Sequence, residues 1–526
     1  MPANRKSRVP VYWWRRLSQI LFLALFLFLF RMTDYQGSDE IPYAVNIFFR
    51  WDPLIAASAM LAARTFIALL VPAIVVVLLT LVLGRFFCGW VCPLGTLLDA
   101  SAKVIKPRKT GPAGKFRAGK YYLLALILVC ALFGLPLVGY FDPFSILVRG
   151  LTLSVDPALN ASVSQPFDYI YQSETLDFMA PVSEPVYGFI KDRLLPYEQK
   201  FFALALPSLF ILLAVFGLEK IERRSWCRNL CPLGAMLALF SRFAPLRQHP
   251  GGSCASRDCN TCRDICRMGA INEEGVISPG DCNLCLDCVA ECHKQIISFK
   301  FRKTKRKPAA AGVSRRGFAW TLVAGLALPA FYKGRALHKR PHPELIRPPG
   351  ALPEEEFLDR CVRCGECMKV CINNAIQPAF LESGSEGTFS PVVVPRIGYC
   401  EYNCTLCGQV CPTGAIQELA LSEKKEVKIG RAHFDKNRCL PWARGIPCVV
   451  CEEMCPVPDK AIRTREVKVL NQKDEEVTVQ QPYIVFELCI GCGRCENACP
   501  LPGEAAVRVI SGGESRDPEN QGYVLY

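Results

Sequence analysis

Cysteines recur along this chain in groups of four, at spacings that would let their thiolates hold metal clusters. Of the four groups nearest the C-terminus, two have the spacing C-x2-C-x2-C-x3-C, in which three thiolates bind one 4Fe-4S cubane and the fourth reaches the partner cluster. Two more groups differ only in the first gap, which in one of them is the loop CLPWARGIPC. The four groups are Cys361, Cys364, Cys367 and Cys371; Cys400, Cys404, Cys407 and Cys411; Cys439, Cys448, Cys451 and Cys455; and Cys489, Cys492, Cys495 and Cys499.

Two further groups lie closer to the N-terminus, separated by the short stretch MGAINEEGVISPGD. They are Cys254, Cys259, Cys262 and Cys266, followed by Cys282, Cys285, Cys288 and Cys292. Crosswise ligation would give one cluster from Cys254, Cys259, Cys262 and Cys292, and a second from Cys282, Cys285, Cys288 and Cys266. Structural zinc sites usually contain two C-x2-C pairs far apart, and disulfides are rare in reducing compartments. Six repetitions of four cysteines therefore predict six 4Fe-4S clusters.

A different cysteine phrase, C-x3-C-P-L-G, occurs twice, as CGWVCPLG and as CRNLCPLG. It places Cys88 and Cys92 in one copy and Cys227 and Cys231 in the other. Residues four apart share one face of a helix, so each copy can present two thiols together. Four such thiols would suffice for a seventh cluster; the alternative is that they pack or merely orient the start of a helix.

Each phrase is preceded by an aromatic-Asp-Pro element, which contains Asp52 in the first copy and Asp142 in the second. The membrane part thus reads as a duplicated two-helix unit. Buried or interfacial carboxylates can accept the protons that a quinol releases on oxidation, so we expect Asp52 and Asp142 to serve a quinol site. The alternative is that each Asp only caps a helix or starts a turn.

The elements that carry these residues include long apolar segments. The 526 residues have a mean hydropathy of +0.20 and are 51% hydrophobic, with the apolar excess in the first 220 residues and near 317–332. Five spans are expected, of which the first and last are short for crossing about 30 Å of hydrocarbon. They cover residues 17–30, 65–84, 121–139, 201–218 and 320–331.

The distribution of basic residues predicts which side of the membrane each part of the chain faces. Lys and Arg are frequent in the N-terminal tail and in residues 85–120, whereas residues 32–57 contain only Arg50. The N-terminus and both C-P-L-G phrases are therefore expected on the cytoplasmic side. Residues after the fifth span are expected in the periplasm, and the stretch Ser314-Arg315-Arg316-Gly317-Phe318 resembles an internal twin-arginine export signal.

Together these features predict an α-helical membrane domain with α+β ferredoxin-like 4Fe-4S domains on both of its sides. We expect a four-span domain over 1–245, a cytoplasmic two-cluster domain over 246–300 and a periplasmic four-cluster domain over 354–526. Residues 301–353 would form the linkers and the fifth span. The expected location is the bacterial inner membrane.

The sequence lacks the motifs that would indicate other cofactors or partners. No C-x-x-C-H string occurs, the five histidines lie outside the spans, and no glycine-rich dinucleotide fingerprint follows a strand. Neither haem nor flavin is expected. The net charge of +14 arises from basic groups beside the bilayer, so it indicates membrane lipid as a partner and not nucleic acid.

These motifs resemble known families. Residues up to about 300 resemble the NapH-type membrane ferredoxins of periplasmic nitrate reduction, which have four spans, two C-x3-C-P motifs and a two-cluster domain. Residues from Ser314 onward resemble the NapG/MauM ferredoxin-type proteins, which have a twin-arginine leader and four cluster groups. This chain differs from those families in one respect. Their members are usually separate chains, whereas here the two are fused and the leader is internal.

The resemblance implies a quinol dehydrogenase component that draws on the quinone pool and passes electrons to a periplasmic oxidoreductase or cytochrome. Other membrane subunits are compatible with it, and it does not specify the acceptor's substrate. Two alternatives stay open: electron flow in reverse, into quinone, and a maturation factor that supplies electrons to activate a metalloenzyme.

Overall fold

The computed structural model describes residues 11–520 except 108–114, 174–177, 179, 194, 197, 251–260, 273–274, 293–296, 302–311, 337–341 and 471. Its contacts divide the chain into two compact units. The first unit comprises residues up to 30, 47–147 and 209–331. The second comprises 31–46, 148–208 and 332 onward. Segments 31–46 and 148–208, which we expected within the membrane domain, thus belong with the C-terminal ferredoxin domain.

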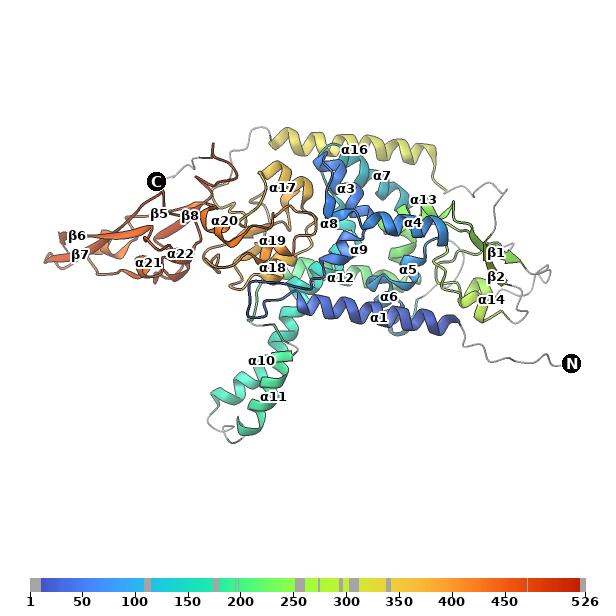
Figure 1. Ribbon diagram of the computed structural model, residues 1–526, viewed down its shortest axis with the longest axis horizontal. Coiled ribbons are helices and arrows are strands. Elements are labelled where there is room, and N and C mark those ends of the chain that lie inside the picture. Colours follow the sequence, from blue (N-terminus) through green and yellow to red (C-terminus); the bar gives the residue numbers. More distant parts are fainter. Residues whose placement is uncertain are drawn as a thin grey trace. The chain divides into compact units, whose positions relative to one another are not determined.

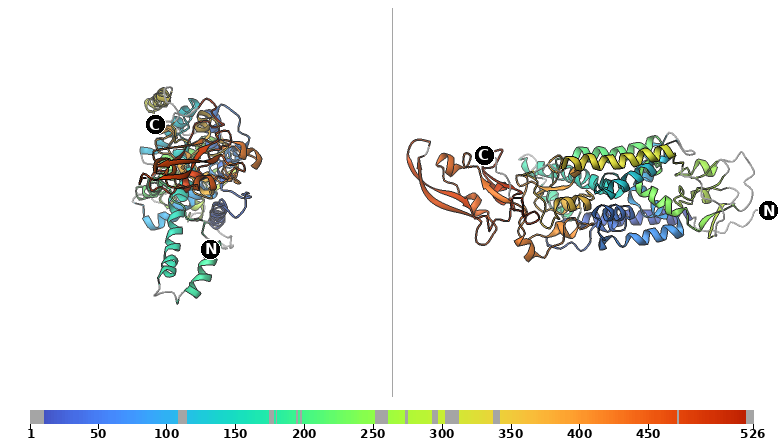
Figure 2. Two further views of the ribbon diagram at one scale, coloured as in Figure 1. Left: turned by 90° about the vertical axis from the view of Figure 1, so that its left-hand side faces the viewer. Right: turned by 90° about the horizontal axis from the view of Figure 1, so that it is seen from above.

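The first unit is a helical bundle followed by a small ferredoxin module. Figures 1 and 2 show α1 and α16 running along opposite sides of this bundle. Its helices are α1 Val11–Met32, α2 Asn46–Arg50, α3 Pro53–Ala63, α4 Ala73–Leu83, α5 Phe86–Trp90, α6 Pro93–Ile105, α7 Gly119–Leu132, α8 Val138–Phe141, α9 Pro143–Gly150, α12 Ala205–Gly217, α13 Pro232–Ser241, α14 Thr261–Asp264, α15 Asp287–Ala290 and α16 Arg315–Ala336. The strands β1 Leu246–Pro250 and β2 Ile297–Phe301 pair antiparallel in the module.

The duplication expected from the sequence appears in the order of these elements. In each copy a short helix, α2 or α8, precedes an Asp-Pro step that opens α3 or α9. An apolar helix, α4 or α12, then leads to the cysteine phrase, after which Pro opens α6 or α13. Proline suits the first turn of a helix because its missing N–H has no partner there.

The predicted spans differ in length from the observed helices. Among the described residues, the helix Tyr12–Met32 has the length and composition to cross a membrane, and shorter apolar helices occupy Pro53–Ala63, Ala68–Leu83 and Pro232–Ser241. The segment expected to span at 320–331 lies in the 22-residue helix α16, whereas the one at 65–84 begins with irregular backbone and Pro72. Hydropathy averaged over a stretch of residues does not show where a helix begins or where irregular backbone interrupts it.

The twin-arginine segment forms the start of α16. Ser314 Oγ accepts a hydrogen bond from the Gly317 N–H at 3.0 Å, and the Ser314 N–H donates to Tyr122 Oη of α7 at 2.9 Å. A Cβ at Gly325 would lie 2.8 Å from Val129, so α16 approaches α7 closely. These contacts hold α16 against the outer face of α7.

The second unit holds the four C-terminal cysteine groups. Its helices are α10 Asp156–Gln172, α11 Ala180–Arg193, α17 Glu354–Arg360, α18 Glu366–Val370, α19 Leu406–Gln409, α20 Leu421–Glu426, α21 Val450–Glu453 and α22 Arg494–Ala498. Its antiparallel strand pairs are β3 Ile376–Pro378 with β4 Pro391–Val393, β5 Arg431–Phe434 with β8 Val507–Ile510, and β6 Ile462–Leu470 with β7 Glu476–Ile484. The one-turn helices α18, α19, α21 and α22 each carry the third cysteine of a group. Figure 1 shows the long β6–β7 ribbon projecting from this unit.

Buried ion pairs connect the helices of the first unit. Arg224, 1% exposed at its side chain, pairs with Asp99 through two hydrogen bonds, from Nε to Oδ1 at 3.0 Å and from Nη2 to Oδ2 at 2.8 Å. Removing one member of such a pair leaves an uncompensated buried charge.

We predict that Asp99→Asn lowers the stability of the protein by about 3 kcal/mol, which would lower the midpoint of thermal unfolding by about 5–10 °C. Circular dichroism of the detergent-solubilised protein measures this midpoint. Since Arg224 and Arg267 lower the pKa of Asp99 against the opposing effect of burial, this stabilisation is present above the ordinary carboxyl pKa of about 4 and is lost as the pH falls through the lower folded value.

Glu476→Gln serves as the matched control, because Glu476 also pairs with a lysine, Lys468, but both side chains are at least 65% exposed. Its midpoint should stay close to that of the wild type. An equal loss of stability in the two variants would contradict the role that we assign to the buried pair.

Candidate iron–sulfur and quinol sites

The two C-x3-C-P-L-G phrases meet in the fold. Cys92 interacts electrostatically with Cys88 of its own phrase and with Cys227 of the other, and Cys231 interacts with all three. Cys227 and Cys231 are buried, and Cys88 and Cys92 are half-buried. Burial, together with these neighbouring thiols, raises the pKa of Cys92 and Cys231, and burial raises that of Cys227 to about 11. The internal symmetry thus assembles one site of four thiols.

No group of three or more His, Cys, Asp or Glu side chains in the described ranges has the tight spacing that encloses a single metal ion. A cubane is larger than one ion and separates its four thiolate ligands accordingly. Four thiols that face one another from two helix starts fit a cluster of that kind.

Two buried arginines that we did not single out from the sequence lie across this site. Arg224 Nη2 donates to Gly95 O at 2.8 Å, and Arg85 Nη2 lies 4.0 Å from Cys88 Sγ. A Cβ at Gly95 would lie 3.3 Å from Arg224 Nη2, and a Cβ at Gly234 would lie 2.8 Å from Arg85 Nη2. The arginine of each copy therefore covers the glycine of the other, which explains the glycine of both C-P-L-G phrases.

The signal for these arginines is present in the sequence. Both copies read R-x2-C-x3-C-P-L-G, with the arginine three residues before the first cysteine. A guanidinium beside thiolates offsets their negative charge, as required where several sulfurs gather.

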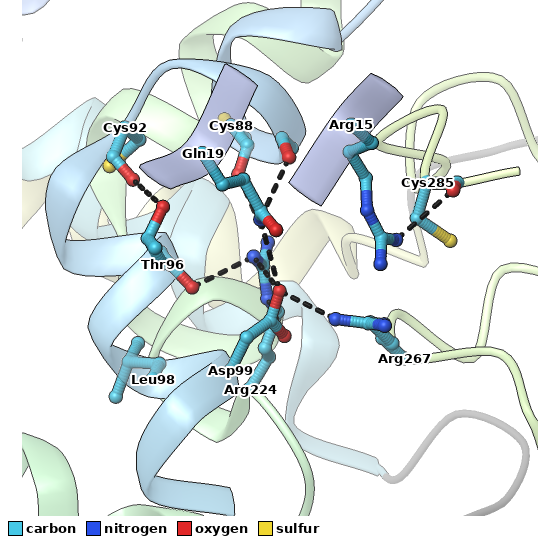
Figure 3. A network of polar contacts seen from close by, with 12 residues as sticks. Arg15, Gln19, Cys88, Cys92, Thr96, Leu98, Asp99, Arg224, Arg267 and Cys285 are labelled. Carbon is cyan, nitrogen blue, oxygen red and sulfur yellow. Dashed lines mark hydrogen bonds and ion pairs between the residues drawn. The ribbon is translucent and has the colours of Figure 1, made fainter. Parts of the chain in front are cut away.

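Figure 3 shows the polar network next to this site. Asp99 of α6 accepts hydrogen bonds from Arg224 and from Gln19 Nε2 of α1, at 3.2 Å for the latter. Its Oδ2 also lies 2.7 Å from Arg267 Nη1, and Arg267 Nε lies 2.5 Å from Asp287. One carboxylate of the helical bundle is thereby connected to the ferredoxin module.

The module's cysteine loop packs directly on the first cysteine phrase. Arg85 Nη1 donates to Gly280 O at 3.0 Å, and Trp90 Nε1 donates to Leu284 O at 3.0 Å. A Cβ at Gly89 would lie 2.3 Å from Asn283 O, so only glycine permits this approach. The four-thiol site and the loop of Cys282 and Cys285 are therefore immediate neighbours.

Within the module the thiols gather crosswise. Cys288 interacts with Cys285, Cys282, Cys266 and Cys262, in that order of strength, and burial with these neighbours raises its pKa. The set Cys282, Cys285, Cys288 and Cys266 is the one that we predicted. For the other predicted set, Cys254 and Cys259 lie outside the described residues, while Cys262 and Cys292 lie within them.

Asp52 and Asp142 are also brought together. Asp52 Oδ1 accepts hydrogen bonds from the N–H groups of Leu54 and Ile55, at 2.7 and 3.2 Å, so it caps α3. Asp142 Oδ2 accepts from the Ser145 N–H at 2.8 Å in the same way. Both side chains are fully buried, and their carboxyl groups interact with each other. The capping role that we considered as an alternative is real, yet it places the two acids in one pair.

The two aspartates lie outside the stretches expected to span a membrane. Burial raises the pKa of Asp52 well above its ordinary value and the Asp142 carboxyl adds to the rise; burial also raises the pKa of Asp142. A neighbouring carboxylate disfavours ionisation of a carboxyl group, as burial does. The pair therefore has a raised affinity for protons.

Buried aromatic rings lie between this pair and the four-thiol site. Phe144, two residues after Asp142, has its ring centroid 6.2 Å from that of Phe87, which adjoins Cys88. Phe48 and Phe49 approach Phe144 at 5.8 and 6.2 Å. The contact of Phe87 with Phe144 is edge-to-face and the other two are tilted, and such contacts pack an apolar interior without polar groups.

In the second unit the C-terminal thiols form four sets, each made of three cysteines from one group and one from its neighbour. Set 1 is Cys361, Cys364, Cys367 and Cys411; set 2 is Cys400, Cys404, Cys407 and Cys371; set 3 is Cys489, Cys492, Cys495 and Cys455; and set 4 is Cys439, Cys448, Cys451 and Cys499. The interactions of the buried thiols follow these sets. The cysteine spacing is compatible with pairing of neighbouring groups and with a nested arrangement, in which the first group pairs with the fourth. The structure favours the pairing of neighbouring groups.

The four sets form a chain. Cys367 of set 1 interacts with Cys407 of set 2, and Cys495 of set 3 interacts with Cys451 of set 4. Sets 2 and 3 meet where the Cys400 N–H donates to Cys492 O at 2.8 Å. Sets 1 and 4 are consequently the two ends.

Comparisons with known families agree with these cysteine sites. One family model, described as a 4Fe-4S binding domain, matches residues 65–112 and 202–250, which are the two copies of the duplication, and also 407–429. A 4Fe-4S dicluster domain matches 360–415, a further 4Fe-4S binding domain matches 482–501, and a model described as NosR matches 252–307. No solved structure matches the chain.

Curated relatives match each part of the chain. The methylamine utilization ferredoxin-type protein MauM of Methylorubrum extorquens is 35% identical over 41% of this chain and 94% of its own length. The ferredoxin-type protein NapG of Escherichia coli is 36% identical over 31% of this chain and 70% of its own length. The ferredoxin-type protein NapH of Haemophilus influenzae is 26% identical over 57% of this chain and 96% of its own length.

The predicted resemblance to NapH-type and NapG/MauM-type proteins is thus confirmed. Ferredoxin-type 4Fe-4S domains make the protein an iron–sulfur electron-transfer protein. The chain belongs to the MauM and NapG family of ferredoxin-type proteins, extended at its N-terminus by a region similar to NapH.

Proposed function

We propose that this protein oxidises a quinol in the membrane and relays the electrons through its C-terminal iron–sulfur domain to a redox partner in the periplasm. The observation that carries the proposal is the meeting of Asp52 and Asp142 as a fully buried carboxyl pair beside aromatic rings. An electron-transfer protein that handled electrons alone would have no use for a proton acceptor in that position.

The chemistry requires both kinds of acceptor. A quinol that becomes a quinone loses two protons and two electrons, and each 4Fe-4S cluster, when bound, accepts one electron. The carboxyl pair accepts the two protons one after the other, at Oδ2 of Asp52 or Oδ1 of Asp142, and passes the first on to solvent before it accepts the second. Neither oxygen receives a hydrogen bond from a described backbone N–H group. The other two carboxyl oxygens cap α3 and α9 and so hold the pair in place.

The cysteine sets are the proposed cluster ligands. Sets 1 to 4 would hold four clusters and the ferredoxin module two. Cys88, Cys92, Cys227 and Cys231 would hold one more, with Arg85 and Arg224 balancing the charge of its thiolates. The match of one 4Fe-4S model to both copies of the duplication supports this seventh cluster.

A location in the inner membrane is supported by the apolar helices and by the similarity to NapH. Large apolar side chains are exposed along α1 and α16, among them Leu21 at 57%, Trp320 at 73% and Leu326 at 51%. Such surfaces are stable against lipid and not against water. We place the N-terminus and the ferredoxin module in the cytoplasm, and the C-terminal domain in the periplasm.

Asp52→Asn together with Asp142→Asn should lower the rate of cluster reduction by a menaquinol analogue by about tenfold to a hundredfold. Asparagine can still cap a helix, so the fold is preserved while the proton acceptor is lost. The measurement is anaerobic stopped-flow reduction, with electron paramagnetic resonance and iron analysis to count the reduced clusters.

Two controls accompany this test. Asp168→Asn changes an exposed aspartate of α10 and should leave the rate unchanged. Reduction of the double variant by dithionite should equal that of the wild type, because dithionite delivers no protons to the pair. Unchanged quinol turnover in the double variant would remove the carboxyl pair from the mechanism, and clusters that no quinol reduces would favour reverse flow or a maturation role.

Replacement of Cys88, Cys92, Cys227 and Cys231 by alanine should remove about four iron atoms and four sulfide ions per chain, the content of one cubane. Cys130→Ala is the control, since this buried thiol of α7 contacts Gly325 O at 3.7 Å and belongs to no set. Iron and sulfide analysis of the purified proteins decides the matter: an iron content equal to that of the wild type would mean that the four thiols hold no cluster.

A further inference from the structure

The chain of thiol sets in the second unit has one covered end, at set 1. A Cβ at Gly365, beside Cys364, would lie 3.7 Å from Arg149 Cα and 3.8 Å from Thr152. Arg149 Nη1 donates to Arg363 O at 3.2 Å, and the guanidinium lies 4.6 Å from the centre of the Phe389 ring. Residues of segment 148–208 thus cover the loop that carries the first cysteines of set 1.

Segment 31–46 and Lys200 cover the neighbouring helices. Asp34, 1% exposed, pairs with Lys200 at 3.0 Å and with Lys369 of α18 at 3.5 Å. Asp39 accepts hydrogen bonds from the N–H and the hydroxyl of Thr405, at 2.7 and 2.9 Å. The helices that bear Cys367 and Cys407 therefore lie beneath other parts of the same chain.

The opposite end, at set 4, carries an additional loop. Eight residues separate Cys439 from Cys448, where a standard group has two. The backbone forms one π-turn over Leu440–Arg444, anchored by Trp442, whose Nε1 donates to Pro482 O at 3.0 Å. Beyond this anchor the loop exposes Ala443, Arg444, Ile446 and Pro447.

This end is basic around an apolar centre. From Lys436 to Pro447 the sequence contains Lys436, Arg438 and Arg444 and no acidic residue. Arg465 of β6 joins them, since Lys436 and Arg465 lie 4.7 and 5.3 Å from the centre of the Trp442 ring. Ile446 and Met454 are 42% and 40% exposed in the same region. Glu453 of α21 is an exposed acid nearby, but Lys460 Nζ bonds to three carbonyl groups of that turn, including Glu453 O at 2.9 Å.

We propose that the loop 440–447 is the docking surface for the electron acceptor, and that the acceptor is a soluble redox protein whose contact face is acidic around an apolar centre. An apolar patch with a charged rim suits a transient encounter, in which the charges steer the partners and the patch brings the redox centres close. Set 4 is the end of the chain of sets next to this loop, and its Cys448 and Cys499 are half-buried. A cluster held by set 4 would supply one electron in each encounter, and the acceptor would be reduced by that one electron. This inference rests on the proposed function only for the direction of electron transfer, from set 4 to the acceptor.

The test uses the whole protein, reduced anaerobically with dithionite and mixed in a stopped-flow instrument with small oxidants of opposite charge. Ferricyanide represents the acidic acceptor and hexaamminecobalt(III) a cationic one. At low ionic strength, Arg444→Glu should slow oxidation by ferricyanide about two- to fivefold and accelerate oxidation by the cation. Both effects should vanish near 1 M salt, where charges are screened within about 3 Å.

Lys468→Glu is the matched control, since this cation is 70% exposed on the β6–β7 ribbon away from the loop. It should change neither rate by more than a small fraction. If Arg444→Glu disturbs the cluster content, Arg444→Gln takes its place, because it removes the charge without reversing it. The logarithm of the rate of oxidation by ferricyanide should then change by about half as much.

Equal rates in the wild type and the Arg444 variants, or an equal loss in the control, would overturn the docking surface. Because dithionite supplies the electrons, this outcome is independent of quinol oxidation. Failure of the quinol to reduce the clusters, with the charge dependence intact, would instead count against the proposed function alone.

Discussion

The arrangement of the helical unit depends on the burial of the guanidinium of Arg224. A charged group without solvent is costly unless every donor is paired, and here Asp99, Gly95 O and Cys88 O accept from it. These partners come from the other copy of the duplication, and Asp99 in turn binds Arg267 of the ferredoxin module. The fold can satisfy this one side chain only if both copies adopt their observed positions, and Arg267 joins the module to the same network.

The same internal symmetry explains why sequence motifs that predict little when taken singly can form a site when they occur as a pair. One Asp-Pro step is a helix cap, and one C-x3-C is a pair of thiols on a helical turn. Repeated and brought face to face, the caps become a carboxyl pair and the thiols become a set of four. Duplication therefore supplies the proposed proton site and the proposed seventh cluster site from elements that a single helix start already requires.

Much of the site could be predicted from the sequence because cysteine spacing constrains ligation directly. The crosswise set of Cys266 with Cys282, Cys285 and Cys288 follows from spacing alone, and so does the correspondence of Asp52 with Asp142. The contacts of Arg85 and Arg224 could not be predicted, since they join residues of different copies and no spacing encodes them. Similarly, hydropathy carries no information that Asp34 and Asp39 bind the ferredoxin domain, or that segment 148–208 packs with it.

The hydrogen bond from the Cys400 N–H to Cys492 O links set 2 to set 3 in the middle of the chain of sets. Clusters held in such an order would act as components in series, in which the slowest transfer governs the whole and no parallel route compensates for a fault. Loss of either inner cluster would then separate the two ends, although the remaining clusters could still be reduced and oxidised. Oxidative damage to one inner cluster would accordingly remove about four iron atoms and yet abolish the whole transfer of electrons.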